Sequence, residues 1–132
     1  DNREIITEHE AKSISNENTF HEDVDNMDFL LQELQRISDK LSNRMMYKKL
    51  QGQSIVVKIK YDNFEIITRS GSLPQLTSDS GVICKAAQQL FLQHWDQTRK
   101  IRLLGIGINN LDSGDDNLGE QLVLPFYTDL RL

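Results

Sequence analysis

Two runs of alternating side chains, separated by a short polar segment, constrain the fold of this chain more than any other feature of its sequence. Within 55–61, and again from residue 64 to 69, apolar residues recur at every second position or nearly so, which is the side-chain period of a β-strand. Asp62-Asn63 between the two runs has the composition of a tight turn. The sequence therefore predicts a β-hairpin, ended by residues 71–74 (GSLP).

Amphipathic helices are predicted on both sides of this hairpin. Apolar residues recur at spacings of three and four through 27–45, after a candidate N-cap at Asp25-Asn26 and before a break at 51–53. A second helix follows the cap candidates of 77–80, and its buried side consists of Ile83, Ala86, Ala87, Leu90, Phe91 and Trp95. Each helix thus has one apolar face that must pack against another element.

Two outer strands complete the predicted order of elements. Residues 11–20 show weak alternation, and residues 101–111 (IRLLGIGINNL) form the last strand. The order strand, helix, strand, strand, helix, strand predicts an α+β fold, in which a four-stranded sheet has both helices packed on one face. The opposite face of the sheet is then open to water or to a partner.

Length and composition restrict the class of protein further. A chain of 132 residues suits one domain, and because it begins with Asp1 rather than Met we expect a piece of a longer protein. No apolar run is long enough to span a bilayer, and the single cysteine, Cys84, excludes an internal disulfide framework. The net charge is −5, but residues 36–60 hold seven basic residues against one acidic residue, so the acidic balance does not exclude a nucleic-acid partner.

The open sheet face is the main candidate binding surface. Alternation predicts hydroxyls, cations and glycines on it, at Ser13, Ser15, Thr19, Lys58, Lys60, Arg69, Gly105 and Gly107. Hydroxyls donate hydrogen bonds, cations supply charge and glycine lets a backbone N–H approach closely, so this set suits phosphates. The same charged residues also fit a solvated sheet face, or an edge protected from aggregation.

Neither a catalytic nor a metal site is predicted. His9, His21 and His94 share no metal-ligand spacing, and Cys84 has no signature of a nucleophile around it. Asp115-Asp116 fits an acidic linker better than a metal site, and Gly105-Ile106-Gly107 lacks the third glycine and the helix of a dinucleotide-binding fingerprint.

The segment QLVLPF, residues 121–126, places large apolar side chains after an acidic, glycine-containing stretch. These side chains either pack back on the domain or form a short peptide that docks in the groove of another protein. Burial of Leu122, Leu124 and Phe126 would contribute roughly 5–8 kcal/mol before ordering costs, which leaves an affinity on the order of micromolar. Such an affinity suits a reversible tether.

Four segments together resemble one family. Ala11-Lys12-Ser13-Ile14-Ser15 with Thr19-Phe20, the hairpin VVKIKYDNFEIITRS and the strand KIRLLGIGI resemble the little finger of Y-family DNA polymerases, most of all its bacterial DNA polymerase IV branch. QLVLPF is similar to the family's motif for the sliding clamp. The resemblance divides the chain into a linker (1–10), the little finger (11–112) and a tail with the clamp motif (113–132).

The resemblance implies a cytoplasmic, nucleoid-associated protein, with no membrane partner, that grips duplex primer–template DNA and binds the bacterial sliding clamp through Gln121, Leu122, Leu124 and Phe126. Carried over by position, the DNA contacts come from Ser13, Ser15, Thr19, Lys58, Lys60, Arg69, Ser70, Arg102, Gly105 and Gly107. Leu103, Gly107 and Asn110 stand where some relatives have basic residues, so a weaker grip is expected. The catalytic carboxylates and their magnesium belong to a palm domain absent from this sequence, so the chain itself is expected to need no cofactor and to be inactive alone.

Two other classes fit the order of elements. A ferredoxin-like regulatory or protein-interaction module would pair its open face with a second copy or a small ligand. An RNA-binding sheet fits less well, because the inner strands lack the exposed aromatic pairs that stack bases.

Overall fold

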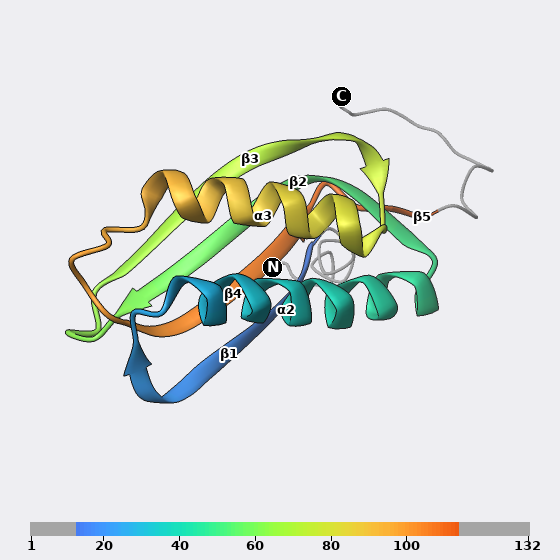
Figure 1. Ribbon diagram of the computed structural model, residues 1–132. Helices are drawn as coiled ribbons and strands as arrows, with labels where there is room; N and C mark the ends of the chain where they lie inside the picture. The colour runs from blue at the N-terminus through green and yellow to red at the C-terminus, as the bar shows by residue number, and fades with distance from the viewer. Residues whose placement is uncertain (1–12, 114–132) are drawn as a thin grey trace, which may run out of the picture.

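A computed structural model of the protein describes residues 13–113. Its helices are α2 (Met27–Tyr47) and α3 (Ser80–His94), and its strands are β1 (Ser13–Val24), β2 (Leu50–Tyr61), β3 (Ile66–Thr77), β4 (Ile101–Asn109) and the short β5 (Asp112–Ser113). The four long strands are antiparallel neighbours in the order β1-β4-β2-β3. Both helices lie on one face of this sheet, α2 against β1 and β4 and α3 against β2 and β3 (Figure 1). The predicted fold class is therefore confirmed.

Local sequence signals set where the two helices begin. The side chain of Asn26 accepts a hydrogen bond from the backbone N–H of Phe29 at 2.9 Å, as the predicted N-cap requires. Asp79 does the same for the backbone N–H of Val82 at 3.0 Å. Asp28 in the first turn of α2 and Arg44 in its last turn both have the sign of charge that the helix dipole favours.

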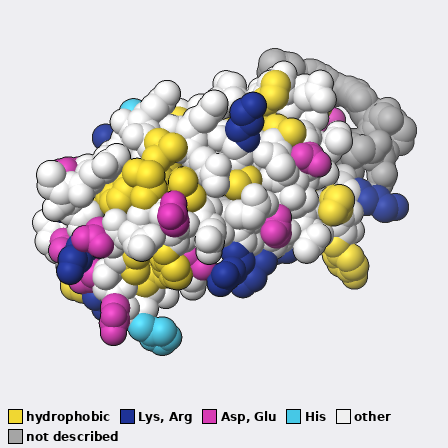
Figure 2. Space-filling view, viewed as in Figure 1, with side chains coloured by type: hydrophobic (Ala, Val, Ile, Leu, Met, Phe, Trp, Pro, Cys, Tyr) yellow, Lys and Arg dark blue, Asp and Glu magenta, His cyan; other side chains and the backbone are white. Residues whose placement is uncertain are grey.

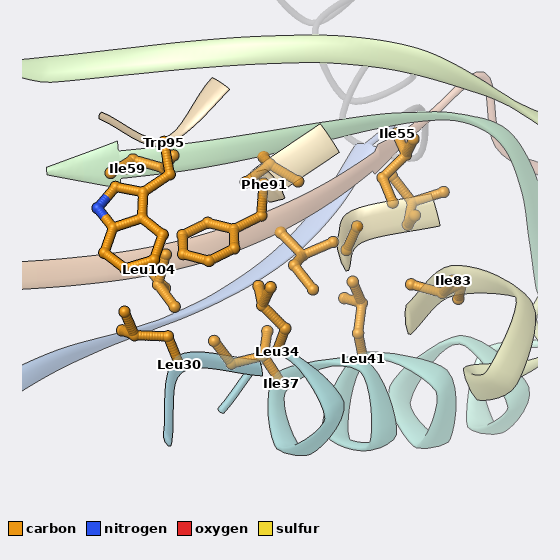
Figure 3. Packing of buried hydrophobic residues seen from close by; sticks show 14 of the residues in the cluster. Leu30, Leu34, Ile37, Leu41, Ile55, Ile59, Ile83, Phe91, Trp95 and Leu104 are labelled. Carbon is orange, nitrogen blue, oxygen red and sulfur yellow. The ribbon is translucent and has the colours of Figure 1, made fainter. Parts of the chain in front are cut away.

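The core lies between the helices and the covered face of the sheet. Leu30, Leu34, Ile37 and Leu41 of α2 point toward the strands, and Phe91 stacks on Trp95 with ring centroids 5.1 Å apart (Figure 3). The strands contribute these buried side chains: Ile55, Val57, Ile59 and Tyr61 of β2 and Leu104, Ile106 and Ile108 of β4. Because β2 buries every second residue, its other side chains are left on the opposite face.

The hairpin is longer than the sequence predicts. Residues 71–74 do not end it, since β3 continues through Pro74 to Thr77. Proline is tolerated there because β3 is an edge strand, which pairs with β2 alone among the described strands. The short strand β5, which pairs with the start of β2, has no counterpart in the prediction.

The turn that joins β2 to β3 contains three residues, 62–64. Phe64 N–H donates to the carbonyl of Tyr61 at 2.8 Å, and Tyr61 N–H donates to the carbonyl of Glu65 at 2.9 Å. The predicted two-residue turn, with Phe64 already in the return strand, is therefore wrong. One extra residue in a turn moves every following side chain to the other face of the strand, and this affects the site described next.

Candidate nucleic-acid interface

The open face, defined as the sheet face opposite α2 and α3, carries side chains from all four long strands. Residues directly opposite one another in a ladder point to the same side of a sheet, so the register gives four rows across it. Read from β1 through β4 and β2 to β3, the rows are Ser13, Asn109, Ser54 and Ser72; Ser15, Gly107, Val56 and Ser70; Glu17, Gly105, Lys58 and Thr68; and Thr19, Leu103, Lys60 and Ile66.

Most of the predicted open-face residues lie where the alternation places them. The structure brings together Ser13, Ser15, Thr19, Lys58, Lys60, Gly105 and Gly107, with Ser70 beside them. Hydroxyl groups of β1 and β3 thus border a centre that contains two lysines and two glycines. Hydroxyls, ammonium groups and accessible backbone N–H groups are the hydrogen-bond donors and charges that bind phosphate oxygens.

The two glycines form the floor of a shallow hollow of about 180 Å³ in the open face. Ser15 and Glu17 border it on one side, and Val56, Lys58 and Thr68 on the other. A Cβ atom on Gly105 would lie 3.0 Å from Cβ of Glu17, and one on Gly107 would lie 3.5 Å from Cβ of Ser15. Any larger residue at these positions would fill the hollow, so the glycines keep the backbone of β4 open to close approach.

The predicted position of Arg69 is wrong. The sequence places it on the open face, but its register partner is the buried Val57, so it lies on the helix side of β3. Its guanidinium Nη1 donates to the carbonyl of Thr68 at 2.8 Å. The cause is the third turn residue, Phe64, because a two-residue turn would have paired Arg69 with Val56 on the open face.

Arg102 lies at the edge of the open face rather than in one of its rows. It falls at the register irregularity between Lys60 and Tyr61 of β2. Its Nη1 lies 3.3 Å from Oδ1 of Asp23, and its Cζ lies 5.5 Å from the centroid of the Phe64 ring. This cation is therefore shared between a carboxylate and an aromatic ring.

Glu17 is a residue of the open face that the sequence reasoning missed. It has the same parity as Ser13, Ser15 and Thr19, so the alternation itself contained the signal. Its Oε1 lies 3.2 Å from Nζ of Lys58, with both side chains partly exposed. One of the two lysines in the rows of the open face is thus paired with a carboxylate.

On the helix side of the molecule, neither positive nor negative side chains predominate. Acidic and basic side chains are interspersed across it, with apolar side chains between them (Figure 2).

Over residues 13–113, no group of three or more His, Cys, Asp and Glu side chains is placed to hold a metal ion. None of the helices described is long and apolar enough to cross a membrane. The predicted clamp-binding residues Gln121, Leu122, Leu124 and Phe126 lie outside the described residues.

Comparison with known proteins gives a consistent set of relatives. Residues 11–124 match the impB/mucB/samB family C-terminal domain. DNA polymerase IV of Brucella melitensis is 35% identical over 115 residues, which are 87% of this chain and 26% of that protein. DNA polymerase IV of Streptomyces coelicolor is 35% identical over 111 residues, which are 84% of this chain and 23% of that protein. The chain spans about a quarter of the length of these curated relatives.

Solved structures share the fold. The little finger domain of PolIV, in a complex with the beta-clamp processivity factor, has a TM-score of 0.64 at 19% identity, over 88% of this chain and 99% of that one. Dbh DNA polymerase in an insertion ternary complex has a TM-score of 0.66 at 14% identity, over 78% of this chain and 29% of that one. At these identities the likeness is one of fold.

Proposed function

This chain belongs to the family of impB/mucB/samB C-terminal domains, and from that premise we propose that its open face grips duplex primer–template DNA for a Y-family DNA polymerase. The observation that carries the proposal is the composition of the open face. Lys58 and Lys60 supply charge, hydroxyls of β1 and β3 supply donors, and the hollow over Gly105 and Gly107 admits a phosphate close to the backbone.

Contacts of this kind fix the position of a duplex without reading its sequence. The planar side chains of Arg, Asn and Gln, which recognise base edges by two parallel hydrogen bonds, are represented in the rows of the open face by Asn109 alone. A polymerase must accept any template, so a surface that holds phosphates and ignores base identity suits the task.

The test is a salt titration of duplex binding by the whole 132-residue chain. Lys60→Ala should weaken binding to the same extent for unrelated sequences, and should reduce the log–log salt slope by roughly 0.9 for the lost phosphate contact. Lys85→Ala, which removes an exposed lysine from α3 on the helix side, is the matched control and should change neither quantity. A chain that fails to bind duplex at low salt, and instead dimerises through Lys58, would favour the ferredoxin-like module.

The C-terminal segment supports a second partner. We propose that Gln121, Leu122, Leu124 and Phe126 bind a bacterial sliding clamp, because the segment QLVLPF combines large apolar side chains with a leading glutamine and a solved structure of the same fold is in a complex with a beta-clamp. Replacing Gln121, Leu122 and Phe126 with Ala should abolish clamp binding measured by calorimetry. Asp129→Ala, beyond the motif, should leave it unchanged, and equal binding by the triple variant would refute the assignment.

We propose that this chain contributes to DNA synthesis by binding the primer–template and takes no part in the chemical step. In DNA polymerases of this family the catalytic carboxylates and their magnesium belong to the palm domain. We therefore expect the isolated chain to give no primer extension with Mg²⁺ and nucleotides, whereas it should still bind the primer–template. Extension by the purified chain would contradict this division of labour.

A further inference from the structure

Phe64 occupies a backbone conformation that suits glycine. It is the last residue of the three-residue turn between β2 and β3, and its φ is 72°. In the part of the chain that the structure describes, two other non-glycine residues have positive φ: Lys49, just after α2, and Asn110, a residue type that tolerates this region. A bulky aromatic residue is strained there, because its Cβ approaches the backbone.

The Phe64 ring does not offset this strain by entering the core. It is 59% exposed, and its neighbour Ile66 is 49% exposed. Glycine would relieve the strain, and a polar side chain would avoid the exposed apolar surface. Local rules of this kind are broken most often where a residue has a function.

Two cations lie against the same ring. Nζ of Lys60 is 4.9 Å from the centroid of Phe64, and Cζ of Arg102 is 5.5 Å from it. Lys60 and Ile66 belong to one row of the open face, so the ring stands at the end of that face where β2 meets the turn. An exposed aromatic surface with adjacent positive charge is thus continuous with the surface proposed to hold phosphates.

We propose that Phe64, Lys60 and Arg102 form a site for an unpaired nucleotide next to the duplex, with its base stacked on the Phe64 ring and its phosphate held by the two cations. Stacking on an aromatic side chain tolerates every base, which matches a surface that does not read sequence. A base inside a duplex has both faces covered by its neighbours, so a single-stranded base is the fitting occupant. This inference rests on the proposed function, because it assumes that the open face binds DNA.

The experiment measures fluorescence anisotropy of three labelled DNAs with the whole chain. They share one duplex, which is blunt, or carries a single-stranded template overhang, or carries an overhang of the same length made of abasic sites. The abasic overhang keeps the phosphates and removes the bases, so it separates stacking from charge. Wild type should bind the normal overhang about fivefold or more tightly than the abasic one, the low end of base–aromatic stacking.

Two variants at the same position test the ring. Phe64→Gly should abolish the preference for the normal overhang, whereas Phe64→Tyr should keep it. Phe64→Gly should also have a melting temperature no lower than wild type, because glycine relieves the strain at φ 72°. That combination distinguishes loss of a binding group from loss of the fold.

Each failure has a different meaning. If wild type binds duplex but does not distinguish normal from abasic overhangs, or if Phe64→Gly retains the preference, the nucleotide site is wrong and the phosphate grip stands. If wild type binds none of the three DNAs at low salt, the proposed function itself fails. An overhang preference that requires Lys60 and Arg102 but not Phe64 would show a purely electrostatic contact and would overturn the stacking assignment.

Discussion

Replacing Glu17 with Gln should tighten the binding of duplex DNA. Glu17 lies on the open face, and its carboxylate is 3.2 Å from the ammonium group of Lys58. A phosphate that approaches Lys58 must therefore replace this carboxylate as its partner and then remain close to its negative charge. Glutamine keeps the size of the side chain and removes the charge, so it removes both penalties.

The magnitude follows from the exposure of the pair. The side chains of Lys58 and Glu17 are 37% and 52% exposed, and exposed ion pairs contribute about 0.2–1 kcal/mol. Repulsion between the carboxylate and a phosphate roughly 6 Å away adds about 0.7 kcal/mol in water, and about half of that at physiological salt. The sum of about 0.5–1.3 kcal/mol corresponds to binding roughly two- to ninefold tighter.

The assay is anisotropy with a labelled duplex at several salt concentrations. Asp39→Asn removes the same charge from α2, on the helix side, and controls for the overall change in net charge. In a Lys58→Ala background the Glu17→Gln effect should largely disappear, because the partner is gone. Equal gains from Glu17→Gln and Asp39→Asn, or no gain from Glu17→Gln, would refute the reasoning that the ion pair limits the grip.

Predictions at three further sites, Gly105, Phe91 and Cys84, test the fold. Gly105→Val places a Cβ 3.0 Å from Cβ of Glu17, and should cost about 1–3 kcal/mol in urea unfolding while filling the hollow and weakening duplex binding. Phe91→Ala should cost about 3–5 kcal/mol by the same measurement, whereas Leu92→Ala, at a half-exposed position, should cost under about 1 kcal/mol. Burial raises the pKa of the Cys84 thiol; a hydrogen bond with Ser38 lowers this pKa by less, and the charge of Asp39 raises it further. Iodoacetamide should therefore label Cys84 far more slowly in the native state than in urea. Because the folded pKa is the higher one, the unfolding free energy should fall as the pH rises above the ordinary thiol pKa. Fast labelling in the native state would contradict the burial and the raised pKa of the Cys84 thiol.

Much of the fold follows from sequence signals that act over a few residues. The cap at Asn26, the apolar stripe of α2 and the alternation of β2 each depend on near neighbours, and each is found in the structure. The regular alternation of β2 also predicted correctly that Lys58 and Lys60 lie on the open face. These features are predictable because the side chain and the backbone group that it satisfies lie within one or two turns of each other.

The faces of β3 were not predictable in the same way. Both parities of its first residues include an isoleucine, Ile66 and Ile67, so hydrophobicity does not choose between them. The choice depends on the turn, where the sequence shows Asp62-Asn63 and gives no reason to expect a phenylalanine at positive φ. The position of Arg69 and the exposure of Phe64 thus have one origin, and the sequence signal for both was missing.

The order of the strands has a consequence for how the polypeptide reaches this arrangement. The first strand, β1, has its hydrogen-bonded neighbour in β4, which is the last of the long strands to be synthesised and inserts between β1 and β2. During translation β1 must wait, without its neighbour, until residues 25–100 and then β4 have emerged, whereas β2 and β3 pair as soon as their turn is made. A nascent chain stalled before Ile101 should therefore expose β1 and the inner side of α2 to chaperones.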